Sequence, residues 1–353
     1  MINEYQTNQS KSFDNNWQVD FKQAVKTTKE LEEASGRLFP DVEYPLFIPR
    51  PYLYKILELG TNSVLGKQFL PQPEENFEFG EIDPIGDQIY SQGSGVIHRY
   101  HNRILYSPTE ICPIQCRYCF RKNELGNKDP VFKGQLERAL EYIRNNPEVE
   151  EVILTGGDPL ILGDAKLDFI LNSFAHLSQI KMIRLHTRTP VILPNRINQS
   201  FIELLKKIKS KVQILTIVIH TNHILEWTTE FKRAINLLRG EPFNVLSQSV
   251  LLKDINDDPL TLKRLFMGLV SLGVQPYYLH HPDNVKGAQH FRLSLQEGRL
   301  IYRELKAITS GFILPKYVVE LPNGKGKALA YSDQKNLSTW TSHDGHEVHC
   351  EIY

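Results

Sequence analysis

Apolar and polar positions alternate regularly from residue 103 onward. Short runs rich in Val, Ile and Leu are predicted to be strands, and they cover residues 103–107, 151–155, 182–186, 212–220, 245–252 and 274–280. The stretches between them place apolar residues at i, i+3, i+4 and i+7, which is the spacing of one helix face. The clearest sets are Leu136/Ala139/Leu140/Ile143, Leu167/Ile170/Leu171/Phe174, Phe231/Ala234/Ile235/Leu238 and Leu262/Leu265/Phe266/Leu269. Six strand–helix units in series predict a parallel α/β sheet, and because a closed barrel needs eight, we expect an open, partial (β/α)6 barrel of the TIM-like kind.

The segments that flank these units follow other patterns. The N-terminal part is predicted to be mostly helical, and its prolines between residues 40 and 84 indicate an irregular segment that wraps the barrel. Ser294 and Glu297 form a capping-box pattern that opens one more helix, and a glycine-rich turn follows at 322–327. The three expected parts are an N-terminal wrapping segment at 1–98, the barrel at 99–290 and a C-terminal lid at 291–353.

Composition excludes several kinds of partner. The chain has 41 Lys and Arg against 41 Asp and Glu, so no excess charge points to nucleic acid or to an anionic membrane. No apolar run approaches the roughly 18 residues that a membrane-spanning helix needs. Residues 1–17 are rich in Asn, Gln and Ser and lack a hydrophobic signal region. These features predict a cytoplasmic protein, whose thiols stay reduced.

Three of the four cysteines fall within eight residues, directly after the first predicted strand. Cys112, Cys116 and Cys119 have the spacing C-x3-C-x2-C, and three thiolates on one loop can hold three irons of a [4Fe–4S] cluster. The fourth iron then stays open to S-adenosylmethionine, whose carbon–sulfur bond is broken by an electron from the cluster to give a 5′-deoxyadenosyl radical. The motif therefore predicts a radical S-adenosylmethionine enzyme.

Two other interpretations of the cysteines are a zinc site and three buried thiols. Structural zinc usually takes four ligands, and Cys350 lies more than two hundred residues further along the chain. The aromatic Tyr118 just before the last cysteine of the loop is also usual in radical enzymes of this class. We therefore favour the cluster.

A second signal ends the second predicted strand. Gly156 and Gly157 would let the backbone approach a ligand closely, and Asp158 follows them. Alone, such a turn is usually a strand–helix connection. One strand after the cysteine loop, it resembles the glycine motif that contacts the amino group of S-adenosylmethionine.

With these motifs the sequence resembles the lysine 2,3-aminomutases and their relatives, including the aminomutases that act with elongation factor P. The resemblance runs from about Pro49 to Lys327. It rests on separated motifs: GVIHRYHNR at 95–103, the cysteine loop with FRK at 120–122, TGGDPL at 155–160, RTP at 188–190, QSVLL at 248–252, PYYLHHPD at 276–283 and PNGKGK at 322–327.

The resemblance implies a second cofactor, pyridoxal 5′-phosphate, joined as a Schiff base to Lys327 in the glycine turn. A lysine in a flexible turn could reach an aldehyde, but Lys325 is an obvious rival, and a surface lysine is the simpler interpretation of either residue taken alone. The resemblance further implies that Arg99 or Arg103 holds the phosphate and that Arg121 binds the substrate α-carboxylate, since a guanidinium can donate two parallel hydrogen bonds. Exposed arginines beside a strand are the alternative for the first two.

Two acidic residues are expected to select the substrate. Asp283 and Glu320 match the two family aspartates that bind the distal ammonium of lysine, and the glutamate, one methylene longer, is a departure from the family pattern. Two carboxylates favour a cationic side chain, lysine or arginine, over glutamate. Either acid could instead cap a helix. Gln248 is a further candidate for cofactor binding.

The resemblance thus implies an isomerase that converts L-lysine to β-lysine by 1,2-amino migration, with a [4Fe–4S] cluster, S-adenosylmethionine and pyridoxal phosphate. The alternatives are an elongation-factor-P type that makes the opposite enantiomer, an arginine 2,3-aminomutase, and a non-enzymatic iron–sulfur or zinc scaffold. An electron donor such as flavodoxin or ferredoxin is the expected protein partner, and a homo-oligomer is compatible with the sequence.

A metal site is one interpretation of the C-terminal tail, because His343, His346, His349 and Cys350 are closely spaced. The alternation of residues in 346–353 instead predicts a terminal strand, and we favour that interpretation. Larger members of the family carry a zinc-binding cysteine cluster near this end, which this tail lacks.

Overall fold

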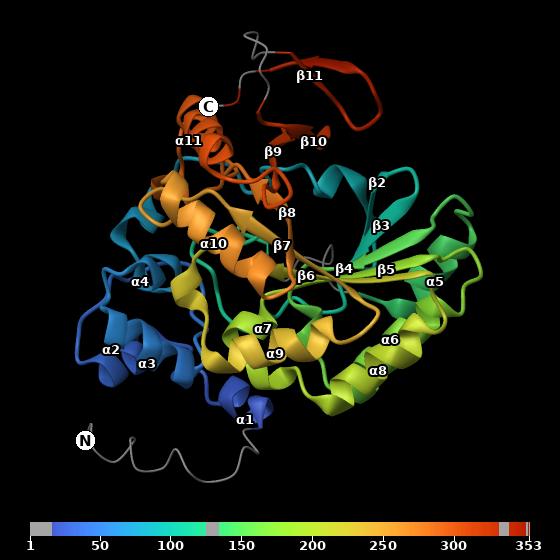
Figure 1. Ribbon diagram of the computed structural model, residues 1–353, viewed down its shortest axis with the longest axis horizontal. Helices are drawn as coiled ribbons and strands as arrows, with labels where there is room; N and C mark the ends of the chain where they lie inside the picture. Colours follow the sequence, from blue (N-terminus) through green and yellow to red (C-terminus); the bar gives the residue numbers. More distant parts are fainter. Residues whose placement is uncertain (1–15, 125–133, 332–338, 351, 353) are drawn as a thin grey trace.

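A sheet of mostly parallel strands forms the centre of the molecule (Figure 1). The computed structural model describes residues 16–124, 134–331, 339–350 and 352. Within these ranges, one ten-stranded sheet runs in chain order from β1 to β10. Its parallel strands are β3 (Arg103–Tyr106), β4 (Glu151–Leu154), β5 (Met182–Thr187), β6 (Ile214–His220), β7 (Asn244–Val250), β8 (Gln275–His280) and β9 (Lys316–Leu321). Antiparallel strands extend both edges: β1 (Ser91–Gly93) and β2 (Val96–Tyr100) at one, β10 (Gly326–Leu329) at the other.

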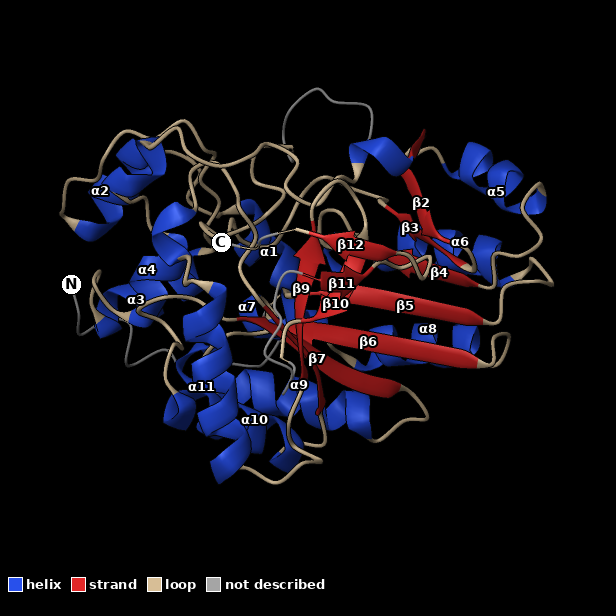
Figure 2. Cartoon of the chain, turned by 90° about the horizontal axis from the view of Figure 1, so that it is seen from above, coloured by secondary structure: helices blue, strands red, loops and turns tan. Residues whose placement is uncertain are grey.

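Amphipathic helices cover one face of this sheet, as the apolar spacing predicted (Figure 2). They are α5 (Leu136–Arg144), α6 (Asp164–Ala175), α8 (Gln199–Lys209), α9 (Thr229–Arg239), α10 (Pro259–Ser271) and α11 (Leu295–Ile308), with the short α7 (Thr189–Ile192). The predicted capping box is present, since Ser294 Oγ accepts from the Glu297 N–H and the Glu297 carboxylate accepts from the Ser294 N–H. β6 is buried along most of its length, as expected for a parallel strand covered on both sides.

The N-terminal part packs beside the sheet rather than on its helix-covered face (Figure 1). It contains α1 (Trp17–Lys22), α2 (Thr28–Ser35), α3 (Arg50–Leu59) and α4 (Val64–Phe69). Leu31, Leu53, Ile56 and Phe69 have no exposed surface and join the main core. Short 3₁₀ turns occur at η1 (Pro73–Asn76), η2 (Gln88–Tyr90), η4 (Pro159–Ile161), η5 (Pro194–Arg196), η6 (Ile224–Glu226) and η7 (Gln289–Phe291).

The fold class is as predicted, and two details differ. The six predicted units end at β8, but α11 leads into β9, which continues the sheet in parallel as a seventh strand. The predicted boundary between residues 98 and 99 falls inside β2, because β1 and β2 form a hairpin that pairs with β3 and so belongs to the sheet. The division into three parts thus stays a prediction.

The chain ends in a separate hairpin of β11 (Thr339–Thr341) and β12 (Glu347–His349), which lies above β9 and β10 in Figure 1. The strand predicted for the tail is therefore present. No helix in the described ranges is both long and apolar enough to cross a membrane.

Candidate active site

One cavity of about 500 Å³ opens at the carboxyl ends of the parallel strands, where active sites of such barrels lie. All the residues that the sequence marked line this cavity: Arg99, Arg103, Cys112, Cys116, Cys119, Arg121, Gly156, Gly157, Asp158, Gln248, Asp283, Glu320 and Lys327. They come from the first residue of β3, from the loop after β3, and from β2, β4, β7, β8, β9 and β10 or the residues that directly follow them. The rival Lys325 is absent from the residues that line the cavity in the described part of the chain.

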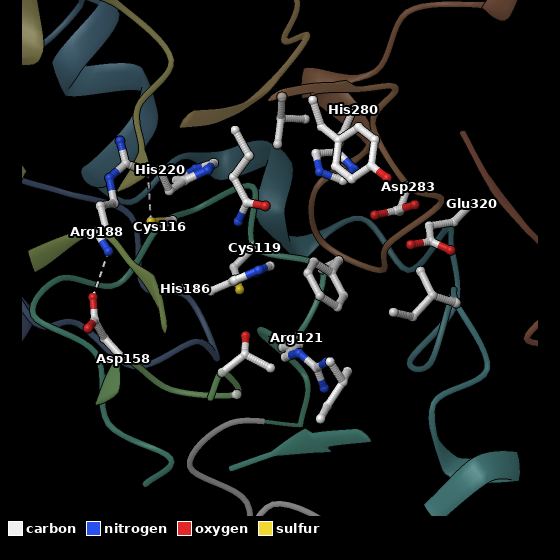
Figure 3. A pocket seen from close by; sticks show the side chains of 18 of the residues that line it. Cys116, Cys119, Arg121, Asp158, His186, Arg188, His220, His280, Asp283 and Glu320 are labelled. Atoms are coloured by element: carbon white, nitrogen blue, oxygen red, sulfur yellow. Dashed lines mark hydrogen bonds between the residues drawn. The ribbon is translucent and has the colours of Figure 1, made fainter. Parts of the chain in front are cut away.

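The three cysteines of the loop line the cavity with thiols that form no disulfide, and Figure 3 shows two of them, Cys116 and Cys119. Burial raises the pKa of each thiol, that of Cys119 to about 12, and neighbouring sulfurs reinforce the effect for Cys112 and Cys119. Such thiols ionise only when cations compensate them. Among the described residues, no three His, Cys, Asp or Glu side chains converge on one metal ion. A cluster with one thiolate on each of three irons does not require such convergence.

A buried ion network fastens the cysteine loop to the N-terminal segment. Arg117, between two of the cysteines, donates from Nε and Nη2 to the Glu75 carboxylate at 2.9 and 2.5 Å. Lys122 Nζ donates to the same carboxylate at 2.9 Å and to two backbone carbonyls. Burial opposes ionisation of Glu75, but its two basic partners lower its pKa overall. The network is nearly free of solvent, since Arg117 is 1 % and Glu75 2 % exposed.

The two glycines after β4 allow the strand end to touch the cysteine loop. Gly156 has φ +97°, and a Cβ there would overlap Ser107 Oγ, while a Cβ on Gly157 would lie 2.5 Å from the Ile111 carbonyl oxygen. The Gly157 N–H donates to the Thr109 carbonyl at 2.9 Å. A side chain at either position would therefore push the cysteine loop away from β4.

Asp158 has protein partners for both carboxylate oxygens. It accepts hydrogen bonds from Thr187 Oγ1 at 2.8 and 2.9 Å, and from the backbone N–H groups of Leu160, Arg188 and Thr189 at 2.7–3.0 Å. These bonds join the loop after β4 to the loop after β5. The residue thus has a clear positioning task, and its predicted contact with S-adenosylmethionine stays a prediction.

Arg188 is a functional candidate that the sequence did not mark. Its Nη1 donates to Cys116 Sγ at 3.1 Å and to the Tyr118 hydroxyl, and its Nη2 lies 3.1 Å from Glu226 Oε2 (Figure 3). Only its place in a motif, at 188–190, could have pointed to it. A guanidinium against a cluster sulfur stabilises negative charge on that sulfur.

A chain of alternating charges spans the opposite end of the cavity. Arg121 Nη2 lies 2.6 Å from Asp87 Oδ2, and Arg99 Nη2 lies 2.7 Å from Asp87 Oδ1. Arg99 Nη1 then lies 3.3 Å from Glu320 Oε2, and the other oxygen of Glu320 accepts from Lys327 Nζ. Asp87, which the sequence did not mark, therefore connects the predicted carboxylate site to the predicted phosphate site.

Lys327 faces Glu320 across the β9–β10 pair, where the two residues are directly opposite. Burial works against the ammonium, but Glu320 raises the pKa of Lys327. Asp283 is partly buried nearby, and burial together with Glu320 raises its pKa to about 7, although Lys327 and Arg292 act in the opposite direction. Of the two acids, Glu320 thus already holds one ammonium group.

The two predicted phosphate-binding arginines differ in how many of their donors already have protein partners. Arg99 is committed to Asp87 and Glu320 and also donates to the Ile85 carbonyl at 2.8 Å. Within the described residues, the polar partner of the Arg103 guanidinium is the Asn102 side chain at 3.2 Å, and the group lies 3.9 Å from the Tyr100 ring centre. Arg103 therefore has more donors left for an anion.

Three neutral histidines line the middle of the cavity (Figure 3). Burial lowers the pKa of His186 and His220 well below the usual value, and burial with the nearby Lys327 lowers that of His280 to about 3. His220 Nε2 lies 2.7 Å from the Tyr118 hydroxyl, whereas His186 Nε2 has no hydrogen-bond partner among the described residues. These three histidines thus add polar, uncharged groups to the cavity wall.

Comparison with known proteins decides the family. Residues 106–265 match the family model of the radical SAM superfamily. The chain is 35% identical over 330 residues to an L-lysine 2,3-aminomutase of Methanococcus maripaludis, with 89% of this chain and 74% of that protein covered. L-lysine 2,3-aminomutases of Escherichia coli and Haemophilus influenzae are 37% and 34% identical, with 79% and 89% of this chain and 81% and 95% of those proteins covered.

The chain belongs to the lysine 2,3-aminomutase family. Membership implies the three cofactors that the sequence predicted, namely a [4Fe–4S] cluster, S-adenosylmethionine and pyridoxal phosphate. The side chains present fit them. The three cavity-lining thiols could hold the cluster, the backbone beside Gly156 and Gly157 could approach S-adenosylmethionine, and Lys327 with Arg103 could hold pyridoxal phosphate.

The cavity carries both basic and acidic side chains at the positions that were predicted to bind the substrate. A guanidinium, Arg121, stands at one position and two acids, Asp283 and Glu320, at another. The glutamate that departs from the family pattern has its charge within the cavity, where it contacts both Arg99 and Lys327. The Glu320 carboxylate thus lies in the cavity wall that Lys327 also lines.

Proposed function

We propose that this protein is a lysine 2,3-aminomutase, which moves the α-amino group of L-lysine to the β-carbon to give β-lysine. The single observation that supports it best is the meeting of three cysteine thiols, Lys327 and a pair of acids in one cavity. When bound, the cluster with S-adenosylmethionine supplies the carbon radical, and pyridoxal phosphate carries the migrating nitrogen.

In this proposal the protein side chains bind and orient. Arg121 takes the substrate α-carboxylate as a second anion beside Asp87, from which it is separated by 2.6 Å. Asp283 and Glu320 take the distal ammonium. Both ends of the substrate are then fixed, so the β-carbon is held in one place relative to the cysteine loop.

Lys327 links cofactor loading to substrate binding. In this structure its ammonium is one of two cations beside Glu320, the other being the Arg99 guanidinium. A Lys327 joined to pyridoxal phosphate would no longer offer Glu320 a free ammonium, and Arg99 would remain as its cation. A substrate ammonium would then add a positive charge beside Glu320 and Asp283, whereas the carboxylate of glutamate would add to the repulsion.

Anaerobic reconstitution tests this function. The full chain is supplied with iron, sulfide, S-adenosylmethionine, pyridoxal phosphate, a reductant and either L-lysine or L-arginine, and the products are separated by chiral chromatography. We expect β-lysine from lysine. No β-amino acid from lysine, together with one from arginine, would refute the substrate, and no cleavage of S-adenosylmethionine at all would refute the radical chemistry.

Lys325 provides a matched control for the cofactor lysine. Lys325 lies in the turn between β9 and β10 and Lys327 lies two residues on, in β10, but only Lys327 of the two lines the cavity. Lys327→Ala should abolish the Schiff-base absorbance and Lys325→Ala should keep it. The opposite result would transfer the assignment to Lys325.

We further propose that a low-potential donor such as flavodoxin or ferredoxin reduces the cluster. Activity with a purified donor of either type and its reductase, in place of a chemical reductant, tests this partner. A homo-oligomer stays a prediction, to be checked by the mass of the native protein in solution.

A further inference from the structure

The C-terminal hairpin reaches back to the turn that carries Lys327. The connection between β11 and β12 is a tight turn, in which the Gly345 N–H donates to Ser342 and the Ser342 N–H donates to His346. His343 lies on this turn. Its backbone N–H donates to the Lys325 carbonyl at 3.0 Å, two residues before Lys327.

The His343 side chain packs against two tyrosines of the site. Its ring centre lies 5.2 Å from that of Tyr100 and 6.0 Å from that of Tyr90, both in edge-to-face geometry. Each tyrosine ring also contacts an arginine: the Arg103 guanidinium lies 3.9 Å from the Tyr100 ring centre and the Arg99 guanidinium 5.6 Å from the Tyr90 ring centre. The His343 imidazole therefore packs against both tyrosine rings that contact the predicted phosphate-binding arginines.

Tyr100 also contacts β10, the strand that carries Lys327. The Tyr100 hydroxyl accepts a hydrogen bond from the Lys327 N–H at 3.1 Å. Gly326 has φ +86°, and a Cβ there would lie 2.9 Å from His343 Cβ and 3.0 Å from the Tyr100 hydroxyl. The absence of a side chain at Gly326 is thus what lets His343 and Tyr100 close on this turn.

The other two histidines of the tail have different surroundings. The side chains of His346 and His349 are 81 % and 70 % exposed, and each lies beside an acid of its own hairpin. They do not gather with His343 into a metal site among the described residues. The histidine spacing that suggested a metal therefore comes from a turn residue and two outward-facing residues.

We propose that His343 is a positioning residue for pyridoxal phosphate, which sets the Lys325–Lys327 turn and the Tyr100 and Tyr90 rings in the arrangement that binds the cofactor. The inference rests on the proposed function, because it assumes that Lys327 carries this cofactor. His343 is not itself among the residues of the described structure that line the cavity, but it contacts Tyr100, which is. It acts through Tyr100 and through the backbone of the turn.

Three variants of the full-length protein with its cluster separate this role from others. His343→Ala removes both ring contacts, His343→Phe keeps an aromatic ring there, and His346→Ala is the matched control on the same turn. The affinity for pyridoxal phosphate is measured from the Schiff-base absorbance, and the rate of borohydride reduction of that Schiff base reports its exposure to solvent. Iron content is measured in each preparation.

We expect His343→Ala to weaken pyridoxal phosphate binding about tenfold, as the loss of two aromatic contacts would, and to speed borohydride reduction. His343→Phe should restore most of the affinity, and His346→Ala should match the wild type. Iron content should be unchanged in all three. Recovery with phenylalanine distinguishes ring packing from a metal or acid–base role, which phenylalanine cannot perform.

Three outcomes would overturn the inference: unchanged affinity in His343→Ala, an equal loss in His346→Ala, or a loss of iron together with pyridoxal phosphate, since the effect would then not be local. Failure of the proposed function looks different. In that case the wild-type protein itself would form no Schiff base at Lys327.

Discussion

The pKa of Asp283 makes a measurable difference to stability. Burial and the neighbouring Glu320 raise this pKa from 3.8 to about 7. Between these two pH values the unfolded chain has lost the proton and the folded chain has kept it, so the free energy of unfolding falls as pH rises from about 4 to about 7. Each tenfold shift of the protonation equilibrium is worth about 1.4 kcal/mol, so the ionised carboxyl destabilises the folded apoprotein by about 4 kcal/mol at pH 8.

The substitution Asp283→Asn removes this titration and keeps the shape of the side chain. We expect the variant apoprotein to gain stability relative to the wild type as pH rises, with the difference growing by about 3 kcal/mol between pH 5 and pH 8. Urea unfolding followed by circular dichroism at several pH values measures it. Taking the difference at each pH cancels the titration of every other group.

A surface carboxylate provides the control. Asp254, whose side chain is 61 % exposed and lies 3.4 Å from Lys67, is changed to Asn in the same way, and the loss of so exposed an ion pair should change the free energy of unfolding by less than about 1 kcal/mol. A flat difference for Asp283→Asn, or one that shrinks toward pH 8, would refute the reasoning. Saturating L-lysine should reduce the difference in the holoenzyme, because a bound ammonium favours the ionised wild-type carboxyl.

Three further substitutions test other parts of the site. Glu75→Gln leaves two buried cations short of their anion, so we expect a loss of about 3–5 kcal/mol in unfolding free energy and a lower iron content by colorimetric assay. Arg188→Met removes the hydrogen-bond donor to Cys116 Sγ, so the reduction potential of the cluster should become more negative. A redox titration followed by electron paramagnetic resonance measures this potential, and an unchanged or higher value would contradict the contact. Gly156→Ala forces a side chain into Ser107 at positive φ, a strain of about 1–3 kcal/mol, and should weaken binding of S-adenosylmethionine in an equilibrium assay; wild-type affinity would contradict the close packing.

The local pattern of apolar residues was sufficient to predict most of the parallel strands and the helices that cover them. The apolar runs and the i, i+3, i+4, i+7 spacing located β3 to β8 and most of the covering helices, because burial on one face imposes its period on the sequence. The helix α8 carries the same spacing, at Phe201, Leu204, Leu205 and Ile208. β9 was missed because pairing with β8, not its own short sequence, places it in the sheet.

The candidate site residues could also be identified from the sequence, because cluster-binding cysteines and a cofactor-binding lysine occur in short, characteristic motifs. The cysteine loop is contiguous, and the TGGDPL and PYYLHHPD motifs lie at the ends of predicted strands. In a parallel barrel, strand ends meet at one face, so residues far apart in sequence were expected in one cavity. All of them do line it, while their individual roles stay predictions.

The residues that support the site could not be inferred in this way. Glu75 meets Arg117 across 42 positions, Arg188 meets Cys116 across 72, and Arg99 meets Glu320 across 221. No local spacing records such a contact, since an ion pair depends only on where folding brings two side chains. Asp87 was likewise indistinguishable from other polar residues of loops, and His343 was marked only as a possible metal ligand.

The sequence by itself therefore determined the radical chemistry, the class of fold and the set of groups able to touch cofactor and substrate. Those follow from residue type and short-range spacing. The tertiary structure alone decided that Arg99 is held by two acids while Arg103 keeps donors for an anion, that Lys327 rather than Lys325 faces the cavity, and that the C-terminal turn packs on the tyrosines of the site. Such choices depend on distances across the folded chain, which only packing sets.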